Sequence, residues 1–289
     1  MEDSFRLVMD VGGSFIKYGV CAPEGDLIES SVGQEPSPAQ GNAQDIGAAF
    51  VRVIRRARAW GPVRSACVST PGPFDFDKGV SLMRHKFAAL YGQSLRTPFE
   101  AEGLLVTFLH DATAYILGEY HEGTLRGAQT PCCVMLGTGL GFACMRAGRA
   151  LVDEGQTPVL RLWCSPYLDG IAEDYVSARA IQARYGVNAS VAQIARWAQE
   201  GDEKARLAFE ETGRHLAALL APVVQALGCD RLALGGQIAK SADLFDLSLP
   251  VPWQPALHLD DAALRGAAWF ARLGRTACVD WTCPPLIRK

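Results

Sequence analysis

A short apolar run that ends in a glycine-rich turn places the first constraint on the fold. Leu7-Val8-Met9 is typical of a buried strand, and it runs directly into Asp10-Val11-Gly12-Gly13-Ser14. Residues 15–21 alternate like a second strand, so the segment predicts a hairpin. Because glycine has no Cβ, a phosphate could approach the backbone N–H groups of the turn and the hydroxyl of Ser14. Asp10, at the strand end, could hold a cation.

The same pattern returns in the middle of the chain. Residues 132–136 read as an apolar strand, Gly137-Thr138-Gly139-Leu140-Gly141 as the turn, and residues 142–145 as the returning strand. A dinucleotide-binding fingerprint would have to open a helix, and the sequence contains no G-x-x-x-x-G-K-[ST] phosphate loop. Either turn alone is typical of a plain hairpin. Two such turns, one with Ser14 and one with Thr138, favour a site in which opposed hairpins hold one polyphosphate.

The composition is that of an enzyme-sized protein with room for two domains. Of the 289 residues, 49% are hydrophobic and 20% are charged, and the net charge of -3 argues against nucleic acid as a partner. The sequence shows neither a signal-peptide pattern nor an apolar run long enough to span a membrane, so we expect a cytoplasmic protein without membrane contact. Nine scattered cysteines without a C-x-x-C pair predict neither disulfides nor a structural zinc.

Strands and helices are expected in two similar units, which predicts an α/β protein of two domains with a cleft between them. The first unit should contain strands at 6–10, 16–22, 26–32, 65–69 and 104–109, with helices at about 42–60 and 97–102. Beyond the strands around the second glycine turn, the second unit should contain helices at about 169–185, 191–200 and 203–227, a strand at 231–234 and a final helix at 261–273.

Several polar residues at the ends of these elements are candidates for chemistry. Asp111 lies between a strand and a helix, where it is either a helix N-cap or a general base that accepts a proton from a hydroxyl group. Gly235-Gly236-Gln237 either packs against a nucleoside or forms a tight strand-to-helix turn. Glu173, near a helix start, is equally explained by the helix dipole. His85 and His110 are more typical of surface or capping positions than of ligands.

Taken in order, these segments resemble the ROK family of bacterial sugar kinases and sugar-responsive repressors. That family has the actin-like, ribonuclease H-like ATPase fold of two α/β domains with an interdomain cleft. The matching segments span nearly the whole chain: Asp10–Ser14, Pro71-Gly72, Asp111-Ala112 with Leu117-Gly118-Glu119, Gly137–Gly141, Leu234-Gly235-Gly236 and Leu264-Arg265-Gly266-Ala267-Ala268.

The resemblance implies an ATP-dependent kinase for a hydroxyl group of a sugar or sugar derivative, with Asp111 as the base and Asp10 near Mg²⁺, bound through water. ATP and its phosphates would be bound by Asp10, Gly12, Gly13, Ser14, Lys17, Gly137, Thr138, Gly139, Gly141, Gly235, Gly236 and Gln237. The sugar would be bound by Gly72, His85, His110, Asp111 and Glu173. The resemblance also implies a homodimer. The N-terminal domain of the chain would cover residues 1–110 and would be joined by the terminal helix within 261–289. The C-terminal domain would cover residues 111–260.

The sequence departs from the family pattern in the half that would bind the sugar. His110 replaces the usual Asn before the base, and the E-x-G-H stretch reads Glu154-Gly155-Gln156-Thr157. The segment that resembles Asn-Leu-Pro-Gly-Trp in the family reads Arg84-His85-Lys86-Phe87, and the cysteine-rich zinc loop is reduced to residues 164–170, so we expect no zinc. A sugar-binding or regulatory member with weak or lost catalysis therefore stays open as an alternative. The identity of the sugar and the choice between ATP and polyphosphate as donor also stay open.

Overall fold

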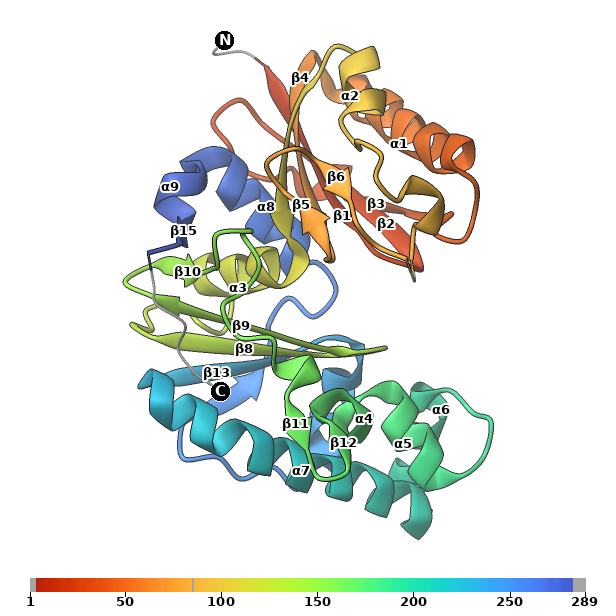
Figure 1. Cartoon of the computed structure of the whole chain (residues 1–289), viewed down its shortest axis with the longest axis vertical. Helices are drawn as coiled ribbons and strands as arrows, with labels where there is room; N and C mark the ends of the chain where they lie inside the picture. Colours follow the sequence, from red (N-terminus) through yellow and green to blue (C-terminus); the bar gives the residue numbers. More distant parts are fainter. Residues whose placement is uncertain (1–3, 85, 283–289) are drawn as a thin grey trace.

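The computed structural model describes residues 4–84 and 86–282, and its first sheet is built around the first glycine turn (Figure 1). The strand order is β3-β2-β1-β4-β7, with β1 antiparallel to β2 and parallel to β4. These strands are β1 (Phe5–Val11), β2 (Phe15–Cys21), β3 (Gly33–Pro36), β4 (Val63–Thr70) and β7 (Leu105–His110). The parallel strands β1, β4 and β7 therefore end at one edge of the sheet.

The second sheet repeats this order around the second glycine turn. Its strands run β14-β13-β8-β9-β10-β15, so that β10-β9-β8-β13-β14 follows the same path as β3-β2-β1-β4-β7. They are β8 (Pro131–Leu136), β9 (Leu140–Arg146), β10 (Arg149–Leu151), β13 (Arg231–Gly235), β14 (Trp253–Pro255) and β15 (Val279–Asp280). The expectation of two similar α/β halves with an actin-like fold is confirmed.

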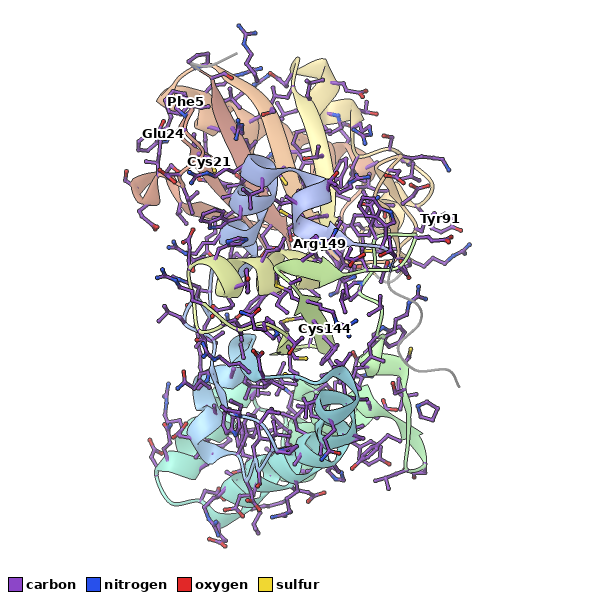
Figure 2. All side chains as sticks on the ribbon, turned by 90° about the vertical axis from the view of Figure 1, so that its left-hand side faces the viewer. Phe5, Cys21, Glu24, Tyr91, Cys144 and Arg149 are labelled. Atoms are coloured by element: carbon purple, nitrogen blue, oxygen red, sulfur yellow. The ribbon has the colours of Figure 1, made fainter. Side chains whose placement is uncertain are left out.

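Helices and sheets alternate along the long axis of the molecule (Figures 1 and 2). Helices α1 (Ala43–Ala57) and α2 (Thr97–Ala101) pack on the outer face of the first sheet. The outer face of the second sheet is covered by α4 (Ala172–Val176), α5 (Ala178–Tyr185), α6 (Val191–Gln199) and α7 (Glu203–Leu227). Between the sheets lie α3 (Asp111–His121) and α8 (Ala262–Leu273), which share a third apolar core with both of them.

The helices α3 and α8 cross with their backbones in direct contact. A Cβ added to Gly266 would lie 1.7 Å from the carbonyl oxygen of Ala114, and one added to Gly118 would lie 2.1 Å from that of Ala262. Both glycines belong to segments on which the family resemblance rests. Their place in the structure is explained by helix packing, because no larger residue fits at this crossing.

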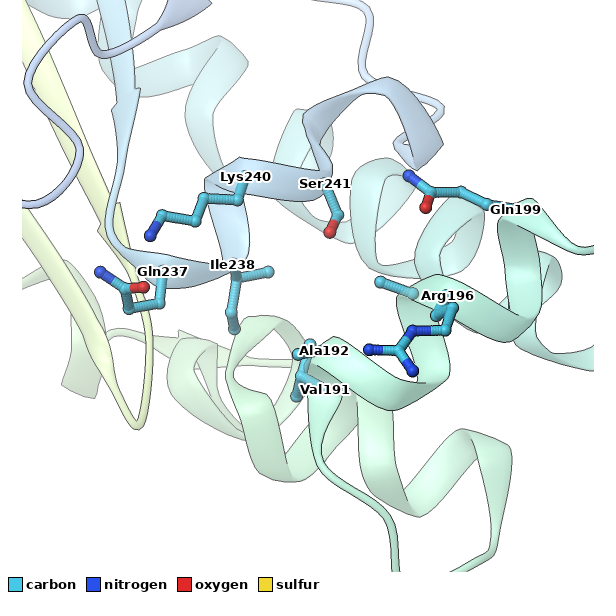
Figure 3. A pocket seen from close by; sticks show the side chains of 9 residues that line it. Val191, Ala192, Arg196, Gln199, Gln237, Ile238, Lys240 and Ser241 are labelled. Carbon is cyan, nitrogen blue, oxygen red and sulfur yellow. The ribbon is translucent and has the colours of Figure 1, made fainter.

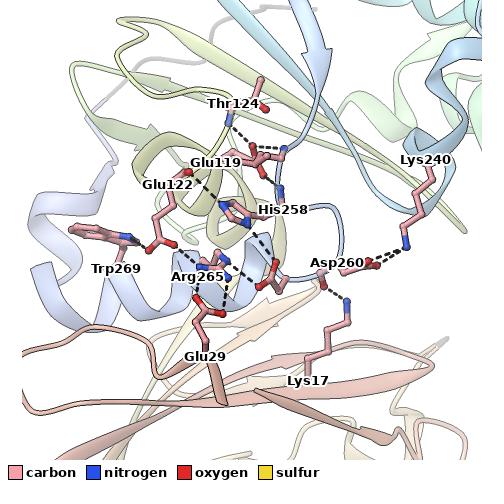
Figure 4. A network of polar contacts seen from close by, with 12 residues as sticks. Lys17, Glu29, Glu119, Glu122, Thr124, Lys240, His258, Asp260, Arg265 and Trp269 are labelled. Carbon is pink, nitrogen blue, oxygen red and sulfur yellow. Dashed lines mark hydrogen bonds and ion pairs between the residues drawn. The ribbon is translucent and has the colours of Figure 1, made fainter. Parts of the chain in front are cut away.

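Each of these central helices packs on the sheet opposite to the one whose strand leads into it. Helix α3 follows β7 of the first sheet but packs mainly on β8, β9 and β10 of the second, with smaller contacts to β4 and β7 of the first. Helix α8 comes after β14 of the second sheet but contacts β1, β2 and β4 of the first. Buried Glu119 of α3 secures the connection into α8, because its carboxylate accepts from the backbone N–H groups of Leu257 and His258 at 3.0 and 2.7 Å (Figure 4).

Three sequence-based expectations about secondary structure are wrong. The expected strand 26–32 contains the short 3-10 helix η1 (Glu29–Ser31), and the third strand begins only at Gly33. The reason is that the hydroxyl of Ser31 accepts from the N–H of Val20 at 2.8 Å, where a strand partner would otherwise pair. The expected helix 169–185 begins as the hairpin of β11 (Pro166–Tyr167) and β12 (Gly170–Ile171) and then breaks at Ser177. Helix 261–273 is not final, since α9 (Arg275–Cys278) and β15 follow it.

The remaining elements are short. They are β5 (Phe74–Asp75), β6 (Val80–Ser81), and the 3-10 helices η2 (Arg58–Trp60), η3 (Ala88–Leu90), η4 (Leu162–Cys164) and η5 (Gln237–Leu244). Within the described residues, none of the helices is both long and apolar enough to span a membrane. The domain boundaries at residues 110 and 260 stay predictions.

Candidate active site

Both glycine turns lie between antiparallel strands, as the sequence predicts. In the first turn the N–H of Gly12 donates to the carbonyl of Phe15 at 3.0 Å, and Ser14 follows at the tip. In the second turn the N–H of Gly137 donates to the carbonyl of Gly139 at 3.0 Å. A Cβ on Gly137 would have no protein atom within 4 Å, so open space lies in front of this turn.

Asp10 lies at the end of β1, next to the end of β4. The hydroxyl of Ser69 donates to its carboxylate at 3.0 Å. Burial and the nearby negative charge of Asp111 raise the pKa of Asp10 to about 6, although the Ser69 hydrogen bond and the charge of Lys17 oppose this rise. The two predicted carboxylates are therefore electrostatic neighbours, and a cation beside Asp10 would stabilise its ionised form.

Asp111 is the first residue of α3, directly after β7. His110 is the N-cap residue of this helix. Its Nδ1 accepts from the N–H of Ala112 at 3.2 Å when it is unprotonated, and donates to Asp111 Oδ1 at 2.9 Å when it carries a proton. The N–H of Ala112 also donates to Asp111 Oδ1 at 2.7 Å. Burial opposes ionisation, but His110, this N–H group and Lys86 together hold the pKa of Asp111 below its ordinary value. With 41% of its side chain exposed, Asp111 presents an ionised carboxylate that can accept a proton.

Of the residues expected to contact the sugar, three lie together. A Cβ on Gly72 would lie 3.5 Å from His110 Nε2, so the turn between β4 and β5 faces His110 and Asp111. His85 lies outside the described residues. Glu173 does not contact these three residues but lies against the second glycine turn.

Glu173, at the start of α4, contacts the turn between β8 and β9. Its carboxylate accepts from the N–H of Leu140 at 2.9 Å, and a Cβ on Gly139 would lie 2.5 Å from its Oε2. Arg179 lies 3.6 Å from the carboxylate and offsets its charge. At the other side of the turn, the N–H of Ala178 donates to the carbonyl of Gly137 at 2.9 Å. The segment α4–α5 therefore fixes the conformation of the second glycine turn.

The glycine pair after β13 is a tight turn packed against its neighbours. A Cβ on Gly235 would lie 2.6 Å from the ring of Tyr115. Gly236 has a positive φ of 81°, and a Cβ there would lie 2.1 Å from the carbonyl oxygen of Leu136. The N–H of Gly236 donates to the Tyr115 hydroxyl at 3.3 Å. Protein packing accounts for both glycines, and their role beside a nucleoside stays a prediction.

Directly after this turn, a cavity of about 350 Å³ opens between α6 and η5 (Figure 3). Its size is within the range of small-molecule sites. It combines apolar walls with amide, hydroxyl and cationic groups, and it is lined by Val191, Ala192, Ala195, Arg196, Gln199, Gln237, Ile238, Lys240 and Ser241.

The comparisons with known proteins agree with this architecture. The sequence profile of the ROK family matches residues 6–273. The chain belongs to the ROK family. It is 25% identical over 296 residues to an N-acetyl-D-glucosamine kinase from Pectobacterium atrosepticum, which covers 90% of this chain and 96% of that protein. A ROK hexokinase from Thermus thermophilus matches with a TM-score of 0.72 and 25% identity, over 91% of this chain and 96% of that chain. A ROK family glucokinase from Streptomyces griseus, in complex with glucose and AMPPNP, matches with a TM-score of 0.73 and 22% identity, over 94% and 100% of the two chains.

In this ROK chain, Asp260 forms hydrogen bonds with two of the predicted ATP-binding residues. The sequence analysis did not identify it. Lys17 of β2 donates to its backbone carbonyl, and Lys240 donates to its carboxylate at 2.8 Å (Figure 4). Gln237 also donates to this carboxylate, at 2.8 Å. These two hydrogen bonds to the carboxylate lower the pKa of Asp260. Lys17 and Gln237, both expected to bind ATP or its phosphates, are thus linked through Asp260. The one sequence signal for it is an acidic pair just before α8.

The segment that corresponds to the zinc loop of ROK proteins is folded by other contacts. It includes the β11–β12 hairpin, where the hydroxyl of Tyr167 is 2.9 Å from Nδ1 of His215. Across residues 4–84 and 86–282, no group of three or more His, Cys, Asp or Glu side chains is arranged to hold a metal ion. The absence of zinc from the purified protein stays a prediction.

The contact between Glu173 and Leu140 suggests a test of whether Glu173 orders the second glycine turn or binds the sugar. We expect Glu173→Ala to raise the KM for ATP about tenfold, because a hydrogen bond to a charged group that orders the turn is lost. The KM for the sugar should change by less than threefold or so, and Asp174→Ala is the control because Asp174 is not bonded to the turn. Steady-state kinetics with each substrate varied measures the difference. A rise confined to the sugar KM would instead support the sugar contact implied by the family resemblance.

Proposed function

We propose that this protein is an ATP-dependent kinase that phosphorylates a hydroxyl group of a sugar or sugar derivative. One observation carries the proposal: Asp10, Ser69 and Asp111 gather where the parallel strands β1, β4 and β7 end. In open α/β sheets, the carboxyl ends of the strands are where ligands bind. The family membership and the kinase named among its relatives support the same reaction class.

Each part of the site then has a role in phosphoryl transfer. Asp111 accepts the proton of the acceptor hydroxyl as its oxygen attacks the terminal phosphorus, and His110 orients the carboxylate through its contact with Oδ1. The backbone and hydroxyl groups of the two glycine turns, Ser14 and Thr138 included, bind the phosphates. The cavity beside Gln237 takes the nucleoside. ADP leaves with the electrons of the broken phosphorus–oxygen bond.

Mg²⁺ fits the residues present. A buried carboxylate with a raised pKa, such as Asp10, gains stabilisation from a nearby cation, and Mg²⁺ is usually held by one or two carboxylates together with substrate phosphates. When bound, the ion would neutralise charge on the β- and γ-phosphates. Asp10 would hold it directly or through water.

The sugar and ATP are the proposed small-molecule partners, and a cytoplasmic homodimer remains part of the proposal. Release of ADP with ATP as donor, and formation of sugar phosphate with polyphosphate as donor, test the function against a panel of neutral, N-acetylated and acidic sugars. We expect one sugar class to stimulate ADP release at least about 100-fold over the rate without acceptor. If no sugar stimulates transfer from either donor, the kinase proposal is wrong.

The region of the E-x-G-H segment favours one alternative, a sugar-binding or regulatory protein with weak or lost catalysis. Gln156 donates to Asp77 at 2.7 Å, and the same carboxylate oxygen accepts from Arg275 at 2.6 Å. Gln156, within the segment that replaces E-x-G-H, is thus engaged with protein groups. Calorimetric binding of a sugar without any phosphate transfer would support this alternative.

The raised pKa of Asp10 predicts a distinctive pH dependence. Below pH 6 its carboxyl group is protonated and cannot hold a cation, whereas Asp111, with its lowered pKa, remains ionised to lower pH. We therefore expect kcat/KM to fall as the pH drops through about 6. Because protons and Mg²⁺ compete for Asp10, raising the Mg²⁺ concentration should move this fall to lower pH. A pH profile that does not depend on Mg²⁺ would argue against Asp10 as the cation ligand.

A further inference from the structure

Lys86 lies in the loop between β6 and η3 and reaches the first glycine turn. A Cβ on Gly13 would lie 3.4 and 3.5 Å from Cδ and Cε of Lys86, so the aliphatic part of the lysine crosses the face of the turn. This loop is one of the segments where the sequence departs from the family pattern. The family resemblance therefore assigns no role to Lys86.

Among the described residues, the ammonium group of Lys86 forms neither a hydrogen bond nor an ion pair within 4 Å. The other lysines of the described residues each have a close contact. Lys17 and Lys240 bind Asp260, Lys78 pairs with Asp75 at 3.1 Å, and Lys204 lies over the ring of Tyr185 at 5.7 Å. A partly buried cation without a direct ion pair, next to a turn suited to phosphate, leaves room for an anionic ligand.

The charge of Lys86 also acts on the catalytic end of the site. It is one of the groups that lower the pKa of Asp111, so its ammonium is near enough to act on the candidate base. Lys86 therefore contacts the first glycine turn and acts electrostatically on Asp111. In the proposed reaction, these are the two parts of the site between which the terminal phosphate would be transferred.

We propose that the ammonium group of Lys86 binds the phosphoryl group during transfer and stabilises the negative charge on its oxygens. The inference rests on the proposed kinase function and adds a catalytic residue to it. Cations placed where charge develops in a transition state are among the largest contributors to catalysis of phosphoryl transfer. A neutral side chain of equal length should therefore lower kcat about 100-fold.

The test compares Lys86→Met with Lys86→Arg and with the control Arg84→Met. Arg84 is a cation two residues away, but its guanidinium lies over the ring of Tyr91 at 4.2 Å. We expect Lys86→Met to weaken calorimetric binding of AMPPNP at least about tenfold and to leave ADP binding unchanged, since ADP lacks the terminal phosphate. Lys86→Arg should retain most of the AMPPNP affinity, and Arg84→Met should retain all of it. Thermal melting of each variant checks the fold.

These outcomes distinguish the inference from the proposed function. Equal effects of Lys86→Met on AMPPNP and ADP, or no effect on either, would overturn the role of Lys86 even if the protein phosphorylates a sugar. Weakened binding of one sugar with unchanged AMPPNP binding would also overturn it and would assign the lysine to an anionic acceptor. The nucleotide comparison needs no turnover, so it tests Lys86 even if no sugar is phosphorylated.

Discussion

Replacing Asp111 by Asn is expected to slow phosphoryl transfer about 10²–10⁴-fold, the usual effect of removing a positioned general base. The amide keeps an oxygen that can accept from the N–H of Ala112 but cannot take the proton of the acceptor hydroxyl. The fold and the affinity for ATP should therefore stay nearly unchanged. Single-turnover rates with saturating ATP and sugar, together with calorimetric titration of ATP, measure the two effects separately.

Asp202→Asn is the matched control for this variant. Asp202 is the N-cap of α7, where its side chain accepts from the N–H of Ala205 at 3.0 Å, so it too accepts from a backbone N–H in the first turn of a helix, away from the proposed site. If Asp111 only stabilises its helix, both variants should show small changes in melting temperature and full activity. Turnover of Asp111→Asn within a few-fold of the wild type would rule out its role as the base.

The second large effect is expected at the glycine turns. Gly137→Ala adds a Cβ that meets no protein atom within 4 Å, and Gly13→Ala adds one in ordinary contact with the flexible side chain of Lys86. Neither should disturb the fold. If phosphates lie against these turns, each methyl group displaces them by about an ångström, and kcat/KM for ATP should fall about 100-fold.

Gly47→Ala in α1 is the control, because its Cβ also meets nothing within 4 Å and lies on a helix of the outer layer. Gly139 is a less informative position, since a larger residue there would collide with Glu173 and disturb the turn with or without a nucleotide. Normal kcat/KM for ATP in both Gly13→Ala and Gly137→Ala would exclude the model of two opposed phosphate-binding hairpins.

The features that could be predicted from the sequence are those set by local chemistry. The two hairpins follow from apolar runs on both sides of glycines, and helix α1 follows from the helical spacing of Ile46, Phe50 and Val53. The strand order repeated in both halves agrees with the family resemblance. The position of Asp111 between a strand and a helix follows from the same local pattern.

The features that could not be predicted depend on contacts between distant segments. Glu173 binds the N–H of Leu140, and Asp260 links Lys17 to Gln237 across more than two hundred residues of sequence. The strand expected at 26–32 was misplaced because the hydroxyl of Ser31 replaces a backbone partner. The residues next to Ser31 in the sequence do not indicate that its side chain, and not a backbone carbonyl, will accept the hydrogen bond of Val20. The same holds for Lys86. That its ammonium group forms no close ion pair is known only from the positions of the other charged side chains among the described residues.

The exchange of central helices between the sheets has a consequence for folding. Each half supplies the helix that covers the inner face of the other, and the two helices meet at Gly118 and Gly266 without intervening side chains. A fragment ending near residue 110 would lack α8 and leave the apolar inner face of its sheet open to water, and the complementary fragment would expose the face of α8 that packs on the first sheet. The halves therefore depend on each other for stability, and the chain should unfold in a single cooperative transition although its architecture is that of two domains.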